Sequence, residues 1–361
     1  MIGTKIKLNE LYGGCSSFSW ETEDNNHIWG RNFDFNRIAA DSKITYLPRN
    51  TEYYTMGNIF ENNLRETDKV TSKYAAIGTG SIVLKSTPTL FEGINEKGLM
   101  GGQLYFRKFA KYPEVEKANT IPLQPAFVVT YLLTQCQSVE EIIDTLNHKV
   151  SIVAQAMMGA IPTVHWIFSD SSGETIIIEP EEETIRIYRN SMGVLTNSPS
   201  YSWHCENLLN YPHIRKKDYD NIKINGVELE QCFSGTGALG LPGDSSSTSR
   251  FVRLSYLKEY GKKGKNEEEG VTYMFRLFQN IAFPLGMVEV ADVDNITEHD
   301  VNVSAYDYTL YTSIMCAESL KFYWTVYENS QIQCIDLSKL MNENKILQYD
   351  MYSGKNIQYL N

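Results

Sequence analysis

Hydrophobic and polar residues alternate in short runs along most of the chain, and turn-forming residues separate these runs. CSSFSW and HIWGRNF flank Asp24, Asn25 and Asn26, which predicts a β-hairpin with Cys15 at its first residue. The series HWIFSD, ETIIIEP, TIRIYRN and GVLTNSP predicts an antiparallel meander, and YDYTLYTSIMC, KFYWTVY and QIQCIDL repeat the pattern near the end of the chain. The chain is therefore expected to be rich in β-strands.

Helical patterns are fewer and lie between the strand-like runs. Residues 125–136 are an apolar run, and Ser138 with Glu141 forms a capping box that opens the next helix. Two more helices are predicted over 247–260 and 268–282. Because no linker or repeat divides the chain, we expect one α+β domain, with helices covering packed sheets.

Composition narrows the classes of partner and compartment. The chain has 361 residues and a net charge of −11, and it carries no basic stripe of the kind that binds nucleic-acid phosphates. It contains neither an apolar run of secretory-signal length at its start nor eighteen consecutive apolar residues, so we expect a cytoplasmic protein without membrane insertion. The six cysteines form no CxxC pair and no metal-ligand spacing, which predicts reduced thiols.

Two motifs that point to cofactors are weak in this chain. Gly235, Gly237 and Gly240 match GxGxxG, but Pro242 follows and prevents the helix start that a nucleotide phosphate needs, so a glycine-rich loop is expected. The histidines show no HExxH or HxH spacing, and His165 fits a core histidine in a strand. We therefore expect neither a cofactor nor a metal.

Cys15 is the candidate nucleophile. It follows Gly13 and Gly14, which would let the backbone bend, and GRNFDF brings Arg31 and Asp34 within reach. An N-terminal cysteine can use its own α-amino group as the base, and a nearby guanidinium lowers the pKa of a thiol. A structural thiol is the alternative, as is a cysteine paired with a distant histidine.

Two further polar residues are candidates for the same site. Asn197 follows a strand-like run and could donate an N–H to a developing oxyanion, or it could cap the turn at Pro199. Arg250 opens a predicted helix, where a cation is unfavourable next to the helix dipole. It could point at Asp34, although a surface arginine is the default expectation.

Eight ordered segments together resemble the choloylglycine hydrolase family, which includes penicillin V acylases and conjugated bile salt hydrolases among the N-terminal nucleophile hydrolases. The resemblance runs from Cys15 nearly to the end of the chain. It is carried by GCSSFSW, GRNFDF, GINEKGLMGGQLYF, FSDSSGETIIIEP, GVLTNSPSYSWH, GALGLPGD, SRFVRLSY and YDYTLYTSIMCAES.

The resemblance implies a four-layer αββα sandwich and a role for each candidate. Cys15 would be the nucleophile once residues 1–14 are removed, and 15–361 would form the single catalytic domain. Its freed amine would be the base, Arg31 would stabilise the thiolate, and Asp34 would hold the amine. Asn197 and the backbone N–H of Tyr105 would form the oxyanion hole, and Arg250 would complete the polar network.

Substrate and assembly are also implied only by the resemblance. The substrate would be a small N-acyl amide, and Tyr105 looks like the tyrosine of penicillin V acylases, so penicillin V is expected first, conjugated bile salts second and acyl homoserine lactones third. A homotetramer is expected, with 203–235 as the assembly segment. The fourteen residues before Cys15 depart from the family pattern, which leaves an unprocessed, catalytically silent binding protein as the competing class.

Overall fold

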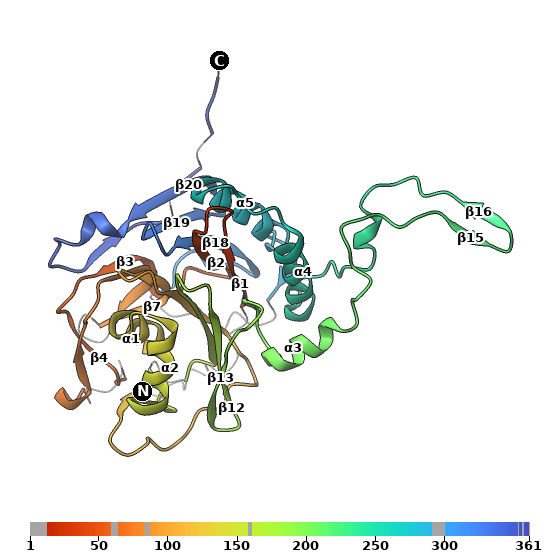
Figure 1. Ribbon diagram of the computed structural model, residues 1–361. Coiled ribbons are helices and arrows are strands. Elements are labelled where there is room, and N and C mark those ends of the chain that lie inside the picture. Colours follow the sequence, from red (N-terminus) through yellow and green to blue (C-terminus); the bar gives the residue numbers. More distant parts are fainter. Residues whose placement is uncertain are drawn as a thin grey trace.

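Two antiparallel β-sheets lie face to face, and helices cover their outer faces (Figure 1). The computed structural model describes residues 13–58, 64–83, 87–157, 161–290, 300–352, 354–355 and 357–360. Helices α4 and α5 pack on one sheet, and α1 and α2 pack on the other. The predicted α+β class and the αββα layering are confirmed.

The first large sheet has seven strands, and it includes the two strands that carry Cys15, Arg31 and Asp34. In spatial order they are β14 (Val194–Leu195), β1 (Gly14–Glu21), β2 (His27–Phe35), β18 (Tyr306–Cys316), β19 (Lys321–Val326) and β20 (Asn329–Asp336), with β17 (Val288–Glu289) paired to β18. The outer face is covered by α4 (Ser247–Tyr260) and α5 (Glu267–Gln279), and α3 (Tyr201–Leu208) packs beside α4.

The second large sheet has eight strands. In spatial order they are β13 (Thr184–Tyr188), β12 (Thr175–Glu181), β11 (Val164–Ser169), β8 (Met100–Tyr105), β7 (Thr87–Asn95), β6 (Ala76–Val83), β3 (Lys43–Leu47) and β21 (Leu347–Tyr349). Its outer face is covered by α1 (Val128–Gln135) and α2 (Val139–His148).

Short elements complete the described chain. Three small two-stranded sheets are formed by β4 (Glu52–Tyr54) with β5 (Lys69–Thr71), β9 (Ile121–Leu123) with β10 (Val150–Ile152), and β15 (Ile222–Ile224) with β16 (Val227–Leu229). Short 3₁₀ turns are η2 (Ala39–Asp41), η3 (Glu66–Asp68), η4 (Pro125–Phe127), η5 (Thr236–Ala238) and η6 (Leu337–Leu340). No helix in these described ranges is both long and apolar enough to cross a membrane.

The local predictions hold for the helices and for the first hairpin. Ser138 caps α2 by accepting the N–H of Glu141 at 3.2 Å, as the capping box predicts. The carboxylate of Glu141, however, accepts from the N–H of Gln137 at 2.9 Å, one residue earlier than in the standard box. Helix α4 spans the predicted 247–260, and α5 ends at Gln279, three residues before the predicted end.

The predicted meander over HWIFSD to GVLTNSP is correct for three of its four runs. β11, β12 and β13 pair in order, but β14 leaves this sheet and pairs with β1 in the other one. The chain crosses between the sheets at Gly193, whose φ of +65° suits glycine and whose carbonyl accepts the N–H of Ser19. This crossing carries the segment that follows, 196–199, to the end of β1 where Cys15 lies.

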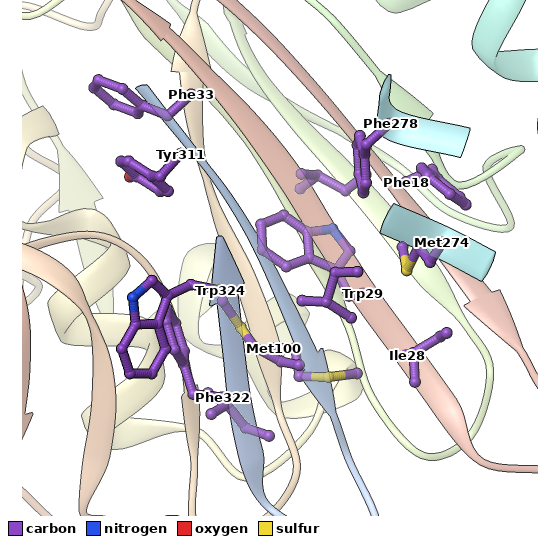
Figure 2. Close-up of a cluster of buried hydrophobic side chains, with 14 of the residues drawn as sticks. Phe18, Ile28, Trp29, Phe33, Met100, Met274, Phe278, Tyr311, Phe322 and Trp324 are labelled. Atoms are coloured by element: carbon purple, nitrogen blue, oxygen red, sulfur yellow. The ribbon is translucent and has the colours of Figure 1, made fainter. Parts of the chain in front are cut away.

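The main core fills the space between the two sheets and below α4 and α5 (Figure 2). Period-two alternation divides the side chains of the eight-stranded sheet between two cores. Ile167 belongs to the core between the sheets, whereas its neighbours Trp166 and Phe168 pack on the side of α1 and α2. Phe33 and Tyr311 stack at 5.0 Å between ring centroids, and Phe33 lies directly beside the candidate site.

Candidate active site

Strand pairing brings the predicted nucleophile and the predicted cation together. In β1 and β2, Cys15 lies opposite Phe33 and Ser17 lies opposite Arg31, so Cys15 and Arg31 are diagonal neighbours on one face. Nη2 of Arg31 lies 2.7 Å from the sulfur of Cys15, and both side chains are buried. The expected contact between Arg31 and the thiol is present.

Glu92 of β7 holds Arg31 in place, and the sequence reasoning did not identify it. Nη1 of Arg31 lies 3.1 Å from Oε2 of Glu92 and also donates to the carbonyl of Gln103 at 2.7 Å. The same carboxylate oxygen accepts the hydroxyl of Tyr311 at 3.0 Å. The available signal was a charged residue inside the apolar strand LFEGI, where a buried carboxylate requires a cationic partner.

The expected lowering of the Cys15 pKa does not occur in this structure. Burial raises the pKa of the Cys15 thiol, and the attraction of Arg31 offsets only part of that rise. The carboxylate of Asp34 also raises this pKa, while Arg250 and the backbone N–H of Tyr105 lower it. A buried thiol of this kind needs a proton acceptor close by before it can act as a nucleophile.

Asn197 bonds directly to the backbone nitrogen that the chemistry requires. Its Oδ1 accepts the N–H of Cys15 at 2.8 Å and Nη2 of Arg250 at 2.7 Å. Arg250 also donates from Nη1 to the carbonyl of Cys15 at 2.6 Å and to the hydroxyl of Ser16 at 2.6 Å. The default expectation of a surface Arg250 is therefore wrong, because its guanidinium is buried and satisfied by the start of β1.

The two predicted oxyanion donors come from residues that both contact Cys15. Nδ2 of Asn197 donates one N–H to the carbonyl of Tyr105 at 3.0 Å, which leaves its second N–H for another acceptor. The backbone N–H of Tyr105 faces the sulfur of Cys15. Together these groups can stabilise negative charge that develops on a carbonyl oxygen beside the sulfur.

Asp34 lies beside Cys15 but does not bond to its nitrogen in this structure, since Asn197 accepts that N–H. Oδ1 of Asp34 accepts the hydroxyl of Thr309 at 2.5 Å, and its buried Oδ2 has no hydrogen-bond partner among the described residues. Burial raises the pKa of Asp34 to about 6, with Arg250 opposing the rise. Asp307 lies close by, and burial together with the charge of Asp34 raises its pKa to about 7.

Gly13 and Gly14 both lie where a side chain would meet its neighbours. Gly14 belongs to strand β1, and a Cβ there would lie 2.8 Å from the ring of Phe283 and 3.2 Å from Cβ of Asp34. At Gly13 a Cβ would lie 2.9 Å from the ring of Tyr105. Residues 1–12 of the predicted leader lie outside the described residues.

A cavity of about 170 Å³ opens beside the sulfur. Cys15 and Arg31 line it, and most of the other described lining side chains are apolar. These are Phe33, Ala39, Ala40, Phe91, Leu104, Tyr105, Ala126, Met157, Ile161, Pro162 and Val164. Gly13 and Gly14 line a second hollow together with the polar side chains of Arg107, Asn197, Arg250 and Asp307.

The remaining candidate motifs do not line the cavity beside Cys15. The GxGxxG segment forms the 3₁₀ turn η5 and loops on either side, and Gly235 has a φ of +87°. Among the described residues, no three His, Cys, Asp or Glu side chains lie together in a way that could hold a metal ion. His165 and His204 are buried near Asn197 and bond to the backbone there.

The two packed sheets with helices on their outer faces are the fold of the N-terminal nucleophile hydrolases, and Cys15 is the candidate nucleophile within it. Residues 15–349 match the model of the family described as linear amide C–N hydrolases, choloylglycine hydrolase family. The chain belongs to this family and is a hydrolase of linear amide C–N bonds.

Individual relatives give the same result. A bile salt hydrolase/transferase from Clostridium perfringens is 32% identical over 352 residues, which cover 96% of this chain and 100% of the relative. The crystal structure of a mutant conjugated bile acid hydrolase from the same organism aligns with a TM-score of 0.83 at 30% identity, over 96% of this chain and 100% of that one. A penicillin V acylase from Pectobacterium atrosepticum is 26% identical over 75% of this chain and 68% of its own. The comparisons favour bile salt hydrolases over the penicillin V acylases that Tyr105 alone had put first.

Proposed function

We propose that this chain hydrolyses conjugated bile salts through Cys15, releasing the bile acid and the amine. The observation that carries the proposal is that Cys15, Arg31 and Tyr105 line one apolar cavity, while the side chain of Asn197 bonds to the nitrogen of Cys15 and to the carbonyl of Tyr105. Similarity to bile salt hydrolases over 96% of the chain supports this substrate class.

The reaction follows from the contacts of Cys15. Once the bond between Gly14 and Cys15 is cut, the free α-amine, with a pKa of about 7.7 to 8.0 in peptides, takes the thiol proton. The thiolate attacks the amide carbonyl, and the N–H groups of Asn197 and Tyr105 stabilise the oxyanion. The ammonium then protonates the leaving amine, and an acyl thioester remains. The same amine next deprotonates water, which attacks the thioester and releases the acid.

The surroundings of the α-amine suit a group that changes its charge. Oδ1 of Asn197 already accepts from the nitrogen of Cys15, and Oδ2 of Asp34 is a buried acceptor without a partner in the described part of the chain. An ammonium beside Asp34 would supply the cation that this buried carboxylate needs. We therefore assign Asp34 to hold the amine after removal of residues 1–14.

Penicillin V is the second candidate substrate, because the side chain of Tyr105 lines the cavity beside Cys15. An aromatic ring at this point can stack on a phenoxyacetyl group. Comparison of kcat/KM for glycocholate, penicillin V and a long-chain acyl homoserine lactone tests the ordering. We expect glycocholate to be the best of the three, and a clear preference for either of the others would overturn it.

Assembly as a homotetramer is proposed through the hairpin of β15 and β16, which extends away from the body of the molecule (Figure 1). The apolar side chains of this hairpin and of the segment after it are exposed to solvent in the single chain: Ile222, Ile224, Val227, Leu229 and Phe233. Exposed apolar groups on such an arm are typical of an interface. Light scattering is expected to give a tetramer, and the double change Ile224→Ser and Val227→Ser is expected to lower the mass. A monomeric unaltered protein would contradict the proposal.

A cytoplasmic location is proposed because the cysteines of the chain are free thiols. All six cysteines are unpaired, and free thiols persist in reducing compartments. Fractionation of the source cells is expected to recover the activity with cytoplasmic markers. Recovery in the culture medium would contradict this.

A further inference from the structure

Two buried histidines donate hydrogen bonds to successive backbone carbonyls, those of Thr196 and Asn197. Nε2 of His165 lies 3.0 Å from the carbonyl of Thr196, and Nε2 of His204 lies 2.9 Å from the carbonyl of Asn197. A carbonyl oxygen only accepts, so Nε2 carries the hydrogen in both rings. The N–H of Asn197 in turn donates to the hydroxyl of Ser247 at 2.9 Å. The backbone before and after the Asn197 side chain is thus held by His165, His204 and Ser247.

The other nitrogen of His165 faces a carboxyl group in the interior. Nδ1 of His165 lies 2.8 Å from Oε1 of Glu179, and both side chains are fully buried. Because Nε2 already carries a hydrogen, Nδ1 of a neutral ring offers a lone pair, which cannot bond to an ionised carboxylate. The short contact therefore requires a second proton between Nδ1 and Oε1. The backbone N–H of Tyr201 donates to both oxygens of Glu179, at 3.1 and 3.0 Å, and fixes the carboxyl group.

The surroundings favour a neutral pair with the proton on the carboxyl group. Burial raises the pKa of Glu179 to about 7 and lowers the pKa of His165 to about 3. Glu181, on the same strand, is close enough to interact with Glu179, and its own pKa is raised by burial and by that neighbour. The other titratable groups around the pair come from β13, α3 and α4: Arg186, Tyr188, Tyr201, His204, Cys205 and Arg250.

We propose that the proton shared by Glu179 and His165 positions Asn197 for catalysis, so that its loss at alkaline pH releases Asn197 from the oxyanion hole. Without that proton, the carboxylate of Glu179 takes the hydrogen of the ring on Nδ1, and Nε2 turns a lone pair toward the carbonyl of Thr196. The bond that fixes the chain before Asn197 is then replaced by a repulsion. Glu179 and His165 are positioning residues, and their role in catalysis rests on the proposed amide hydrolysis.

The tautomer of His165 can be observed without any activity measurement. In ¹⁵N NMR spectra of the unaltered protein, we expect His165 to carry its hydrogen on Nε2 at about pH 6 and on Nδ1 at about pH 8.5. The change should have a midpoint near the pKa of Glu179, about 7. One unchanged tautomer across this range would overturn the proposal.

The second test separates this proton from the other titrations of the site. In Glu179→Gln the amide donates to Nδ1 at every pH, whereas the α-amine titrates in both proteins, so kcat of this variant relative to kcat of the unaltered protein should rise at least about tenfold between about pH 6 and pH 8.5. KM should change little. The neighbouring change Glu181→Gln is the control, and its kcat relative to kcat of the unaltered protein should change little over this pH range. Identical pH profiles for Glu179→Gln and the unaltered protein would overturn the proposal. Complete absence of hydrolysis in the unaltered protein would instead contradict the proposed function, while the NMR result would still decide the state of the proton.

Discussion

The sulfur of Cys15 lies 2.7 Å from Nη2 of Arg31, although sixteen positions separate the two residues in the chain. The hairpin of β1 and β2 makes them diagonal neighbours on one face of the sheet. The guanidinium also forms an ion pair with Glu92, which fixes its position before any substrate binds. The cation of Arg31 therefore acts on the thiol of Cys15, and it is also a buried charge that needs the carboxylate of Glu92 as its partner.

Replacement of Arg31 is expected to affect stability and activity together. Arg31→Leu leaves the buried carboxylate of Glu92 without its cation, which should lower the free energy of unfolding by about 3–5 kcal/mol. Urea unfolding measures the change. Arg189→Leu is the control, because Arg189 makes its ion pairs with Glu174 and Glu140 at the surface, where such pairs contribute little to stability. Equal effects of the two changes would contradict the buried role of Arg31.

Asp307→Asn is expected to change how stability depends on pH. The pKa of Asp307 is raised to about 7, above about 3.9 for a free aspartate, so the unfolded chain releases this proton first as pH rises. Ionisation therefore lowers the stability contributed by this group between about pH 4 and pH 7, by up to about 4 kcal/mol. Asparagine cannot ionise, so the variant does not lose this stability. The free energy of unfolding of Asp307→Asn minus that of the unaltered protein should therefore be larger at about pH 8 than at about pH 5. Parallel stability curves from urea unfolding at the two pH values would rule this out.

Tyr105→Asn separates the role of the side chain from that of the backbone. The change keeps the N–H that faces Cys15 but removes the aromatic ring from the cavity. Loss of ring stacking should lower kcat/KM for penicillin V about two- to tenfold, since such contacts contribute about 0.5–1.5 kcal/mol. Glycocholate should be affected less. An equal loss for both substrates would show that Tyr105 does not select the acyl group.

Much of the fold could be predicted from local patterns. The alternation in CSSFSW and HIWGRNF defines the pairing of β1 with β2, and that pairing alone puts Arg31 beside Cys15. The αββα layering came from the resemblance rather than from the alternation. The assignment of GVLTNSP to the meander was wrong, because pairing of a short run depends on which sheet it reaches and not on its own pattern.

The residues that support the site were harder to predict than the site itself. Glu92 contacts Arg31, and Thr309 contacts Asp34. In both cases the two residues lie on strands that are distant in sequence. The expected fall in the Cys15 pKa failed for a related reason: burial depends on the packing of both sheets, whereas the sequence indicated only the cation. His165 was correctly expected in the core, but its bond to Thr196 depends on the crossing of the chain between the sheets.

Cys15→Ala tests the role of the nucleophile with little disturbance of the fold. The side chain is buried and small, and we expect hydrolysis of every substrate to fall by at least about 10³-fold with folding unchanged. The exposed thiol of Cys334 provides the control Cys334→Ala, which should retain full activity. Equal activity of the two variants would show that Cys15 is not the nucleophile.

The central claim, that Cys15 reacts with its own free α-amine beside it, is tested most directly by the intact mass of the purified protein under denaturing conditions. We expect the mass of a chain that begins at Cys15. Cys15→Ala, analysed in the same way, shows whether the thiol is needed for removal of residues 1–14. A full-length mass in a preparation that hydrolyses glycocholate would contradict the account, because the nitrogen of Cys15 would then still be part of an amide and could not act as the base.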